Sequence, residues 1–89
     1  MNSLPPASAG GASKILVYGT SWCAECRIAK RVLQEHGVDY DEVDIEANPD
    51  AAREVLRLNN GMRSVPTIIF PDGTVLVEPS RRELTARLQ

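Results

Sequence analysis

The sequence predicts an α/β fold in which three helices flank a four-stranded mixed sheet. Short runs of strand-forming residues alternate with amphipathic helical segments along the first part of the chain. Two further apolar runs are joined by the turn Pro71-Asp72-Gly73, which is typical of a hairpin. The chain has 89 residues, of which 43% are hydrophobic and 25% charged, so it is long enough for one domain with its own core and too short for two.

The first predicted strand is the apolar run at residues 14–18, which has the composition of a buried central strand. Thr20 and Ser21 follow it and offer hydroxyl caps for a helix over residues 23–36. Gly37 then provides the left-handed conformation that commonly ends a helix.

The second predicted strand covers residues 40–45, where apolar and acidic side chains alternate as in a strand with one face in water. Because a helix connects the first two strands, we expect them to be parallel and joined by a right-handed crossover. Asn48 is the expected cap of a second helix over residues 49–58, which has Pro at its first position and ends at residues 59–61.

The last part of the chain predicts a hairpin and a helix. Residues 67–70 and 74–77 are the two strands of the hairpin. Ser80 and Glu83 have the spacing of a capping box, which would open a final helix ending at Leu88. The predicted order is therefore strand, helix, strand, helix, strand, strand, helix, within one domain at residues 14–89.

Composition excludes several classes of function. Residues 1–13 are rich in Ser, Pro, Ala and Gly and lack the positive and apolar regions of a secretory signal, so we expect a disordered leader, or a start codon placed too far upstream, and a cytoplasmic protein. No apolar run approaches the roughly 20 residues that span a bilayer. The net charge is -2 and no basic block is present, so neither a membrane nor nucleic acid is an expected partner.

The motif Trp-Cys-Ala-Glu-Cys at residues 22–26 is the candidate active site. Residues three apart on a helix lie close enough for Cys23 and Cys26 to form a disulfide. Cys23 stands at the predicted helix start, where free N–H groups and the helix dipole favour a thiolate and lower the pKa of such thiols. Cys26 lies one turn deeper and is expected to stay protonated longer. The spacing therefore predicts that Cys23 attacks a disulfide and Cys26 resolves the mixed disulfide that results.

Other interpretations of the two cysteines remain open. They could be inert core residues or a structural bridge, although stable disulfides are rare in the cytosol. A structural zinc site needs about four ligands, and two thiols with a distant His36 would supply them only in a dimer. An iron–sulfur cluster shared by two chains is a further alternative. We expect no metal and no prosthetic group. Glu25 would either disfavour the Cys23 thiolate or select which substrates dock.

Residues 63–67, Arg-Ser-Val-Pro-Thr, form the second candidate element of the site. Pro66 at the mouth of an interior strand removes a ladder N–H, and a cis Val65–Pro66 bond is one reason for it to be there. Arg63 could hold a substrate carboxylate, stabilise a thiolate, or be a solvated loop residue. Trp22 could be a substrate platform or an anchor for its loop.

Several segments share the pattern of a known family. They are the strand ending at Tyr18, residues 20–23, 22–26 and 40–46, Val65-Pro66-Thr67, and the hairpin around Asp72-Gly73. From about residue 14 to residue 88 the chain resembles the glutaredoxin branch of the thioredoxin superfamily, and most of all the mycoredoxins. The resemblance implies a thioredoxin-like fold, thiol–disulfide oxidoreductase activity and Cys23 as nucleophile. It also implies a cis Pro66 and a thiol-binding groove lined by Val65 and Ser80.

Two departures from the family pattern matter. Thioredoxins carry a buried Asp six residues before the first cysteine, where this chain has Val17. Glutathione-binding glutaredoxins usually have Gly-Gly before the last helix, where this chain has residues 78–80, Glu-Pro-Ser. Since Pro79 lacks an N–H, a backbone site for the γ-glutamyl carboxylate is weakened, and mycothiol, which has no such carboxylate, fits better.

The resemblance implies a monomer that reduces mixed disulfides between proteins and a small thiol. Mycothiol or glutathione would be the co-substrate, with a thiol reductase or thioredoxin reductase upstream. One alternative is a dithiol electron donor to ribonucleotide reductase, recharged by thioredoxin reductase. The others are a dimeric iron–sulfur cluster carrier and a docking module without enzymatic activity.

Overall fold

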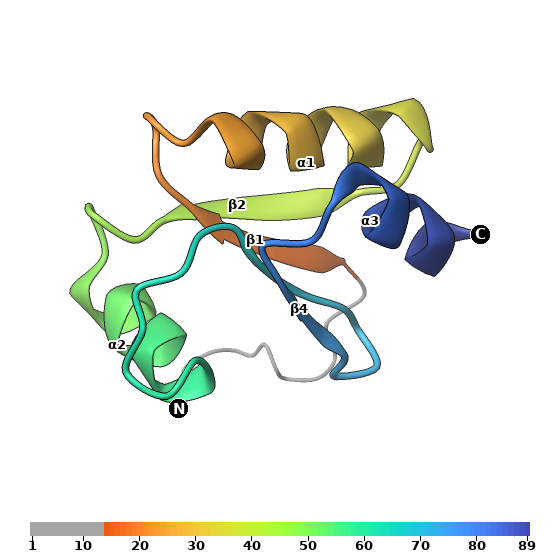
Figure 1. The fold of residues 1–89 in the computed structure, drawn as a ribbon. Helices are drawn as coiled ribbons and strands as arrows, with labels where there is room; N and C mark the ends of the chain where they lie inside the picture. Colours follow the sequence, from red (N-terminus) through yellow and green to blue (C-terminus); the bar gives the residue numbers. More distant parts are fainter. Residues whose placement is uncertain (1–13) are drawn as a thin grey trace.

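A computed structural model describes residues 14–89, and its helices and strands follow one another in the predicted order (Figure 1). Their bounds lie within two residues of the predicted ones. The elements are β1 (Ile15–Gly19), α1 (Ala24–Glu35), β2 (Tyr40–Asp44), α2 (Pro49–Leu58), β3 (Thr67–Ile69), β4 (Val75–Val77) and α3 (Arg81–Leu88). The expected leader at residues 1–13 lies outside the described residues.

The sheet is mixed and has the strand order β2-β1-β3-β4. β1 and β2 are parallel, with Gly19 opposite Asp44, and β3 runs antiparallel to β1, with Thr67 opposite Tyr18. The end of β1 and the beginning of β3 therefore lie at the same edge of the sheet. The loop after β1 and the Val65–Pro66 segment before β3 meet there, which is how residues about 40 apart in sequence come together.

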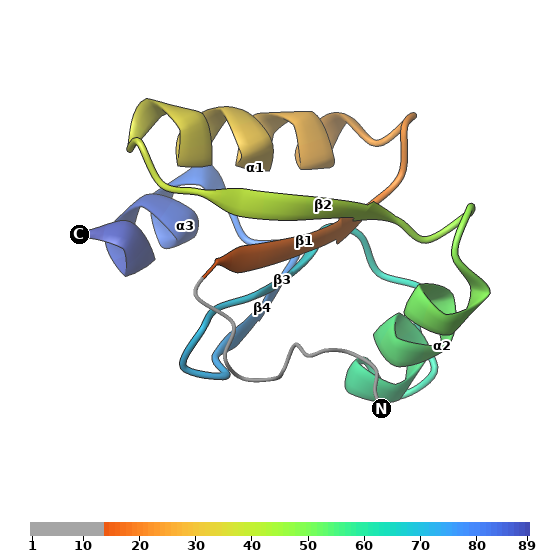
Figure 2. The same cartoon turned by 180° about the vertical axis from the view of Figure 1, so that it is seen from behind.

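Helices cover both faces of the sheet, as Figures 1 and 2 show: α1 and α3 lie on one face and α2 on the other. Side chains of β1 alternate between the two faces, so Val17 joins the core under α1 and α3, whereas Tyr18 joins the core under α2. The first core consists of buried Ile15, Val17, Ala29, Val32, Leu33, Ile68, Phe70 and Leu84. The second consists of buried Tyr18, Ile45 and Val55.

Local signals at the helix ends were predicted with mixed success. The capping box is confirmed: the Glu83 N–H donates to Ser80 Oγ at 3.0 Å, and the Ser80 N–H donates to Glu83 Oε1 at 2.7 Å. Gly37 follows α1 with a φ of +66°, as expected. The prediction for Asn48 is wrong in part. Asn48 stands at the cap position of α2, but its side chain donates to the Asp44 carbonyl at 3.2 Å and makes no cap hydrogen bond.

No helix within residues 14–89 is long and apolar enough to cross a membrane.

Candidate active site

The two cysteines lie at the start of α1, directly after the loop that leaves β1. Both are reduced, and both are almost completely buried, with Cys23 4% and Cys26 2% exposed. The expected difference in depth between them is therefore small. What separates the two sulfurs is their hydrogen bonding.

Cys23 itself caps α1, and its Sγ accepts a hydrogen bond from the Cys26 N–H at 3.1 Å. The prediction that Thr20 and Ser21 cap this helix is wrong. A capping side chain reaches the N–H two or three residues further on, so these hydroxyls stand too early for a helix that begins at Ala24. Thr20 is buried instead, and its Oγ1 has no hydrogen-bond partner among the described residues.

Two oxygens lie near the Cys23 sulfur. The Val65 carbonyl oxygen is 3.8 Å from Sγ, and Glu25 Oε1 is 4.0 Å from it. The Val65–Pro66 bond is cis, as the family resemblance implied. The Cys26 N–H favours a negative charge on the sulfur, whereas the Glu25 carboxylate disfavours it.

Cys26 is the less ionisable sulfur. Burial, together with a hydrogen bond to Cys23, raises its pKa to about 12, while a backbone hydrogen bond from Thr20 and the charge of Lys30 act in the opposite direction. Gly19 packs so closely that a Cβ atom on it would lie 2.8 Å from Cys26 Sγ. At neutral pH this sulfur therefore keeps its proton, and the arrangement favours Cys23 as the sulfur that attacks.

Trp22 precedes Cys23 in the chain, and its side chain is exposed but fixed by one hydrogen bond. It is 64% exposed, and its Nε1 donates to Glu46 Oε2 at 3.0 Å. The ring is accessible and also tethers its loop to the segment after β2, and a role as substrate platform stays a prediction. Sequence reasoning missed Glu46, because only the parallel pairing of β1 and β2 brings it near Trp22.

The other predicted binding residues differ in their availability. Arg63 is exposed and forms no ion pair with any residue of 14–89. Val65 is half-buried, and Pro66 is buried. Two residues before Ser80, the Glu78 N–H donates to the Pro66 carbonyl at 2.8 Å. The N–H and hydroxyl of Ser80 are already engaged in the capping box of α3.

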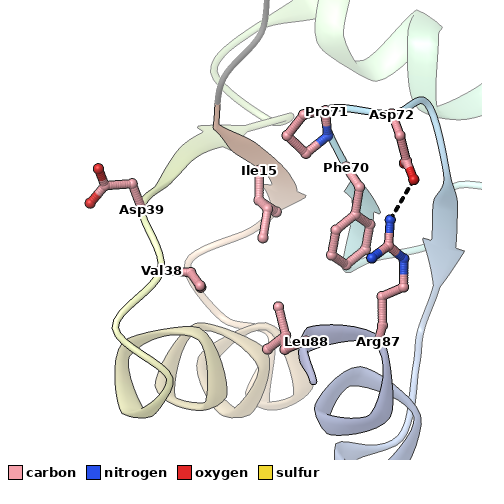
Figure 3. Close-up of a pocket in the computed structure, with 8 residues that line it drawn as sticks. All are labelled: Ile15, Val38, Asp39, Phe70, Pro71, Asp72, Arg87 and Leu88. Atoms are coloured by element: carbon pink, nitrogen blue, oxygen red, sulfur yellow. Dashed lines mark hydrogen bonds and ion pairs between the residues drawn. The ribbon is translucent and has the colours of Figure 1, made fainter.

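Two further features bear on where a ligand could bind. Within the described part of the chain, no cluster of three or more His, Cys, Asp or Glu side chains could hold a metal ion. A pocket of about 540 Å³ lies near the start of β1, at the end of the strand opposite the cysteines (Figure 3). There Arg87 pairs with Asp72 at 2.7 Å and covers the ring of Phe70. It contains no thiol and is separate from the cysteine site.

Comparisons with known proteins match both the sequence and the fold. The family model described as Glutaredoxin matches residues 15–76. A candidate glutaredoxin of Mycobacterium tuberculosis is 46% identical over 74 residues, which cover 83% of this chain and 88% of the relative. Mycoredoxin 1 of Corynebacterium glutamicum is 34% identical over 77 residues, which cover 86% and 95% of the two chains.

Solved structures show the same architecture. A thioredoxin-like protein superposes with a TM-score of 0.72 at 30% identity, over 85% of this chain and all of the other. The glutaredoxin-like NrdH-redoxin of Escherichia coli superposes with a TM-score of 0.70 at 26% identity, over 85% and 95% of the two chains. The predicted thioredoxin-like fold is confirmed.

Proposed function

The chain belongs to the glutaredoxin family of thiol–disulfide oxidoreductases, and we propose that it reduces mixed disulfides between proteins and a low-molecular-weight thiol. The proposal rests on the different surroundings of the two sulfur atoms. Cys23 Sγ receives an N–H at 3.1 Å, whereas burial holds the pKa of Cys26 at about 12.

In the first step the Cys23 thiolate attacks the small thiol's sulfur in the mixed disulfide. A bond forms between Cys23 Sγ and that sulfur, the original S–S bond breaks, and the protein thiolate leaves and takes a proton from water. The Val65 carbonyl lies 3.8 Å from the reacting sulfur, and the exposed Trp22 ring, next to Cys23 in the sequence, is available to a substrate.

In the second step a further small-thiol molecule releases the one bound to Cys23. An ordinary cysteine thiol is a few per cent thiolate at pH 7. Burial raises the pKa of Cys26, so a smaller fraction of this thiol is ionised at pH 7. The external thiol is therefore the better nucleophile by fraction ionised, and attack by Cys26, which would close a Cys23–Cys26 disulfide, is the slower exit.

We further propose mycothiol rather than glutathione as the small thiol. A γ-glutamyl carboxylate needs free N–H donors before the last helix. Pro79 has none, and the Ser80 N–H is taken by the Glu83 carboxylate at 2.7 Å. The 34% identity to a mycoredoxin supports the same choice. A monomer in the cytoplasm fits this role.

The second candidate is a dithiol electron donor to ribonucleotide reductase. It is favoured by the likeness to an NrdH-redoxin and by the Cys-x-x-Cys motif. Such a donor must close the Cys23–Cys26 disulfide in every turnover, so the raised pKa of Cys26 weighs against it.

A steady-state assay separates the two. The purified protein is given mycothiol, glutathione or thioredoxin reductase, each as the sole source of electrons, with a mixed-disulfide substrate. We expect mycothiol to support the fastest turnover, Cys26→Ser to keep most of it, and Cys23→Ser to abolish it. Turnover that depends on thioredoxin reductase and is lost in Cys26→Ser would instead establish the dithiol donor. Equal rates with glutathione and mycothiol would contradict the choice of thiol.

A further inference from the structure

A cation lies one helical turn from Cys26 and is held by an acid from the sheet. Lys30 follows Cys26 by four residues on α1, so the two side chains share one face of the helix. The Lys30 side chain is only 22% exposed, and its Nζ pairs with Glu42 Oε2 at 2.5 Å. Glu42 lies on β2, opposite Val17 of β1.

The charge of Lys30 acts on the Cys26 sulfur from one turn further along α1. Burial and Cys23 raise the pKa of this thiol, whereas a backbone hydrogen bond from Thr20 and, to a smaller extent, the positive charge of Lys30 lower it. The end of β1 at Gly19 and the following Thr20 present uncharged groups to the sulfur. From β2 two acids alternate onto this face: Glu42, which pairs with Lys30, and Asp44, which lies opposite Gly19 and accepts a hydrogen bond from the Glu46 N–H at 2.9 Å.

α3, the other helix on this face of the sheet, does not contribute to the pairing of Lys30 with Glu42. α3 packs against α1, but its charged contact with that helix is the pair between Arg81 and Glu35 at 3.1 Å, which lies at the far end of α1 from Cys26. Val17, at the position where thioredoxins carry a buried Asp, is apolar and fully buried, so it offers no carboxylate to accept a proton. Lys30 is thus the group that can offset the negative charge of Cys26 when its proton leaves to solvent.

We propose that Lys30 is a positioning residue for the Cys26 sulfur, and that its pairing with Glu42 sets how fast Cys26 attacks the mixed disulfide on Cys23. The inference rests on the proposed function, because it concerns the slower of the two exits from that intermediate. In this step Cys26 first gives its proton to water. Its thiolate electron pair then forms the Cys23–Cys26 bond, the bond from Cys23 to the substrate sulfur breaks, and the substrate leaves as a thiolate.

The two partners should act with opposite signs. Removing the Lys30 charge destabilises the Cys26 thiolate and slows the step. Removing the Glu42 charge frees the ammonium group to interact with the sulfur and accelerates it. An ion pair that only joined α1 to β2 would behave differently, because losing either partner would lower stability alike and leave the rate of the step unchanged.

The test uses 5,5′-dithiobis(2-nitrobenzoate), which leaves one arylthio group in a disulfide with Cys23 and releases the other as a coloured thiolate, whatever the natural substrate is. Stopped-flow absorbance resolves a bimolecular phase, when the adduct forms, from a unimolecular phase, when Cys26 expels the second coloured thiol. The variants are Lys30→Met, Glu42→Gln and the double variant, with Lys30→Arg as the matched control that keeps the charge. The unimolecular rate is measured from pH 6 to pH 10.

We expect Lys30→Met to slow the unimolecular phase and Glu42→Gln to accelerate it, each about two- to fivefold at pH 7, the size of effect a partly screened charge produces. The pH profile should move to higher pH in the first variant and to lower pH in the second. The double variant should behave as Lys30→Met, and Lys30→Arg should lie near the parent protein.

Three results would each overturn the proposal. The two single variants could change the rate in the same direction, or neither could change it, or the effect of Glu42→Gln could persist in the absence of Lys30. A Cys26→Ser background provides a second measurement. There glutathione must expel the coloured thiol, and Lys30→Met should leave that rate unchanged; a slower rate would place Lys30 at Cys23 and so contradict the assignment. Since the probe is not a natural substrate, these outcomes stand whether or not mycothiol supports turnover.

Discussion

Replacing Gly19 by Ala tests how closely the resolving sulfur is packed against the sheet. Gly19 ends β1 and has no left-handed backbone conformation, so an alanine there meets no backbone strain. The added Cβ would lie 2.8 Å from Cys26 Sγ and 3.3 Å from Cys26 Cβ. Non-bonded heavy atoms prefer about 3.5–4.0 Å, so the sulfur must move by roughly 0.7 Å or more.

The cost follows from two opposing effects. Overpacking a close-packed core costs about 1–3 kcal/mol. Replacing glycine by alanine at a compatible backbone conformation returns about 0.4–1 kcal/mol by restricting the unfolded chain. We therefore expect Gly19→Ala to lower the free energy of unfolding by about 1–2 kcal/mol, with about 4–8 °C of melting temperature lost per kcal/mol in a domain of this size.

Urea denaturation of the reduced protein measures the change, and a double-mutant cycle assigns it. In a Cys26→Ala background the sulfur is absent, so Gly19→Ala should cost almost nothing or become stabilising. Gly37→Ala is the matched control. Its φ is +66° and no atom lies within 4 Å of the added Cβ, so it should destabilise both backgrounds equally. The same loss from Gly19→Ala in both backgrounds would refute the contact with Cys26 as its cause.

Three further predictions concern charge, protonation and capping. Glu25→Gln removes a negative charge 4.0 Å from Cys23 Sγ, and two unit charges at this distance in water interact by about 1 kcal/mol. Iodoacetamide should therefore alkylate Cys23 up to about fivefold faster at pH 7 in this variant, while Glu25→Asp should change the rate little. Slower alkylation would mean that Glu25 accepts the thiol proton. The pKa of Cys26 rises from 9.0 to about 12 on folding, so its contribution to stability is complete below pH 9 and is lost between about pH 9 and pH 12. Across this window the urea midpoint of the parent protein should fall more steeply with pH than the midpoint of Cys26→Ala. Parallel curves for the two proteins would contradict the raised pKa. Ser80→Ala removes the side-chain acceptor of the capping box and should lower the free energy of unfolding in urea by about 1 kcal/mol. Ser80→Thr keeps a hydroxyl and should retain most of this stability. An equal loss in the threonine variant would show that the hydroxyl is not the cause.

Local sequence signals predicted the elements well because neighbouring residues decide them. The hairpin turn at residues 71–73 and the capping box of Ser80 with Glu83 depend on a few adjacent side chains. Asn48 shows the limit of such reasoning, because an amide at a cap position can donate as well as accept. In the structure it donates to the Asp44 carbonyl instead of accepting from α2.

Contacts across the fold could not be predicted in this way. Trp22 meets Glu46 across 24 residues, and Lys30 meets Glu42 across 12, and both contacts require the position of β2 beside β1. Charge alternation at residues 40–46 predicted a strand with a wet face, but gave no means of choosing which acid would reach which partner. The acids that surround the cysteine site therefore emerge only from the folded chain.

The error at the start of α1 has a chemical meaning. Two hydroxyls were expected to cap this helix, and the reactive sulfur takes their place, so one hydrogen bond from the Cys26 N–H both begins the helix and favours the Cys23 thiolate. A charge-assisted hydrogen bond is roughly twice as strong as a neutral one, so this cap is strongest when Cys23 is reduced and ionised. Any disulfide on Cys23 removes that charge and weakens the cap. This one contact, in the first turn of a helix, therefore favours a negatively charged Cys23 sulfur over a sulfur held in a disulfide, independently of any substrate.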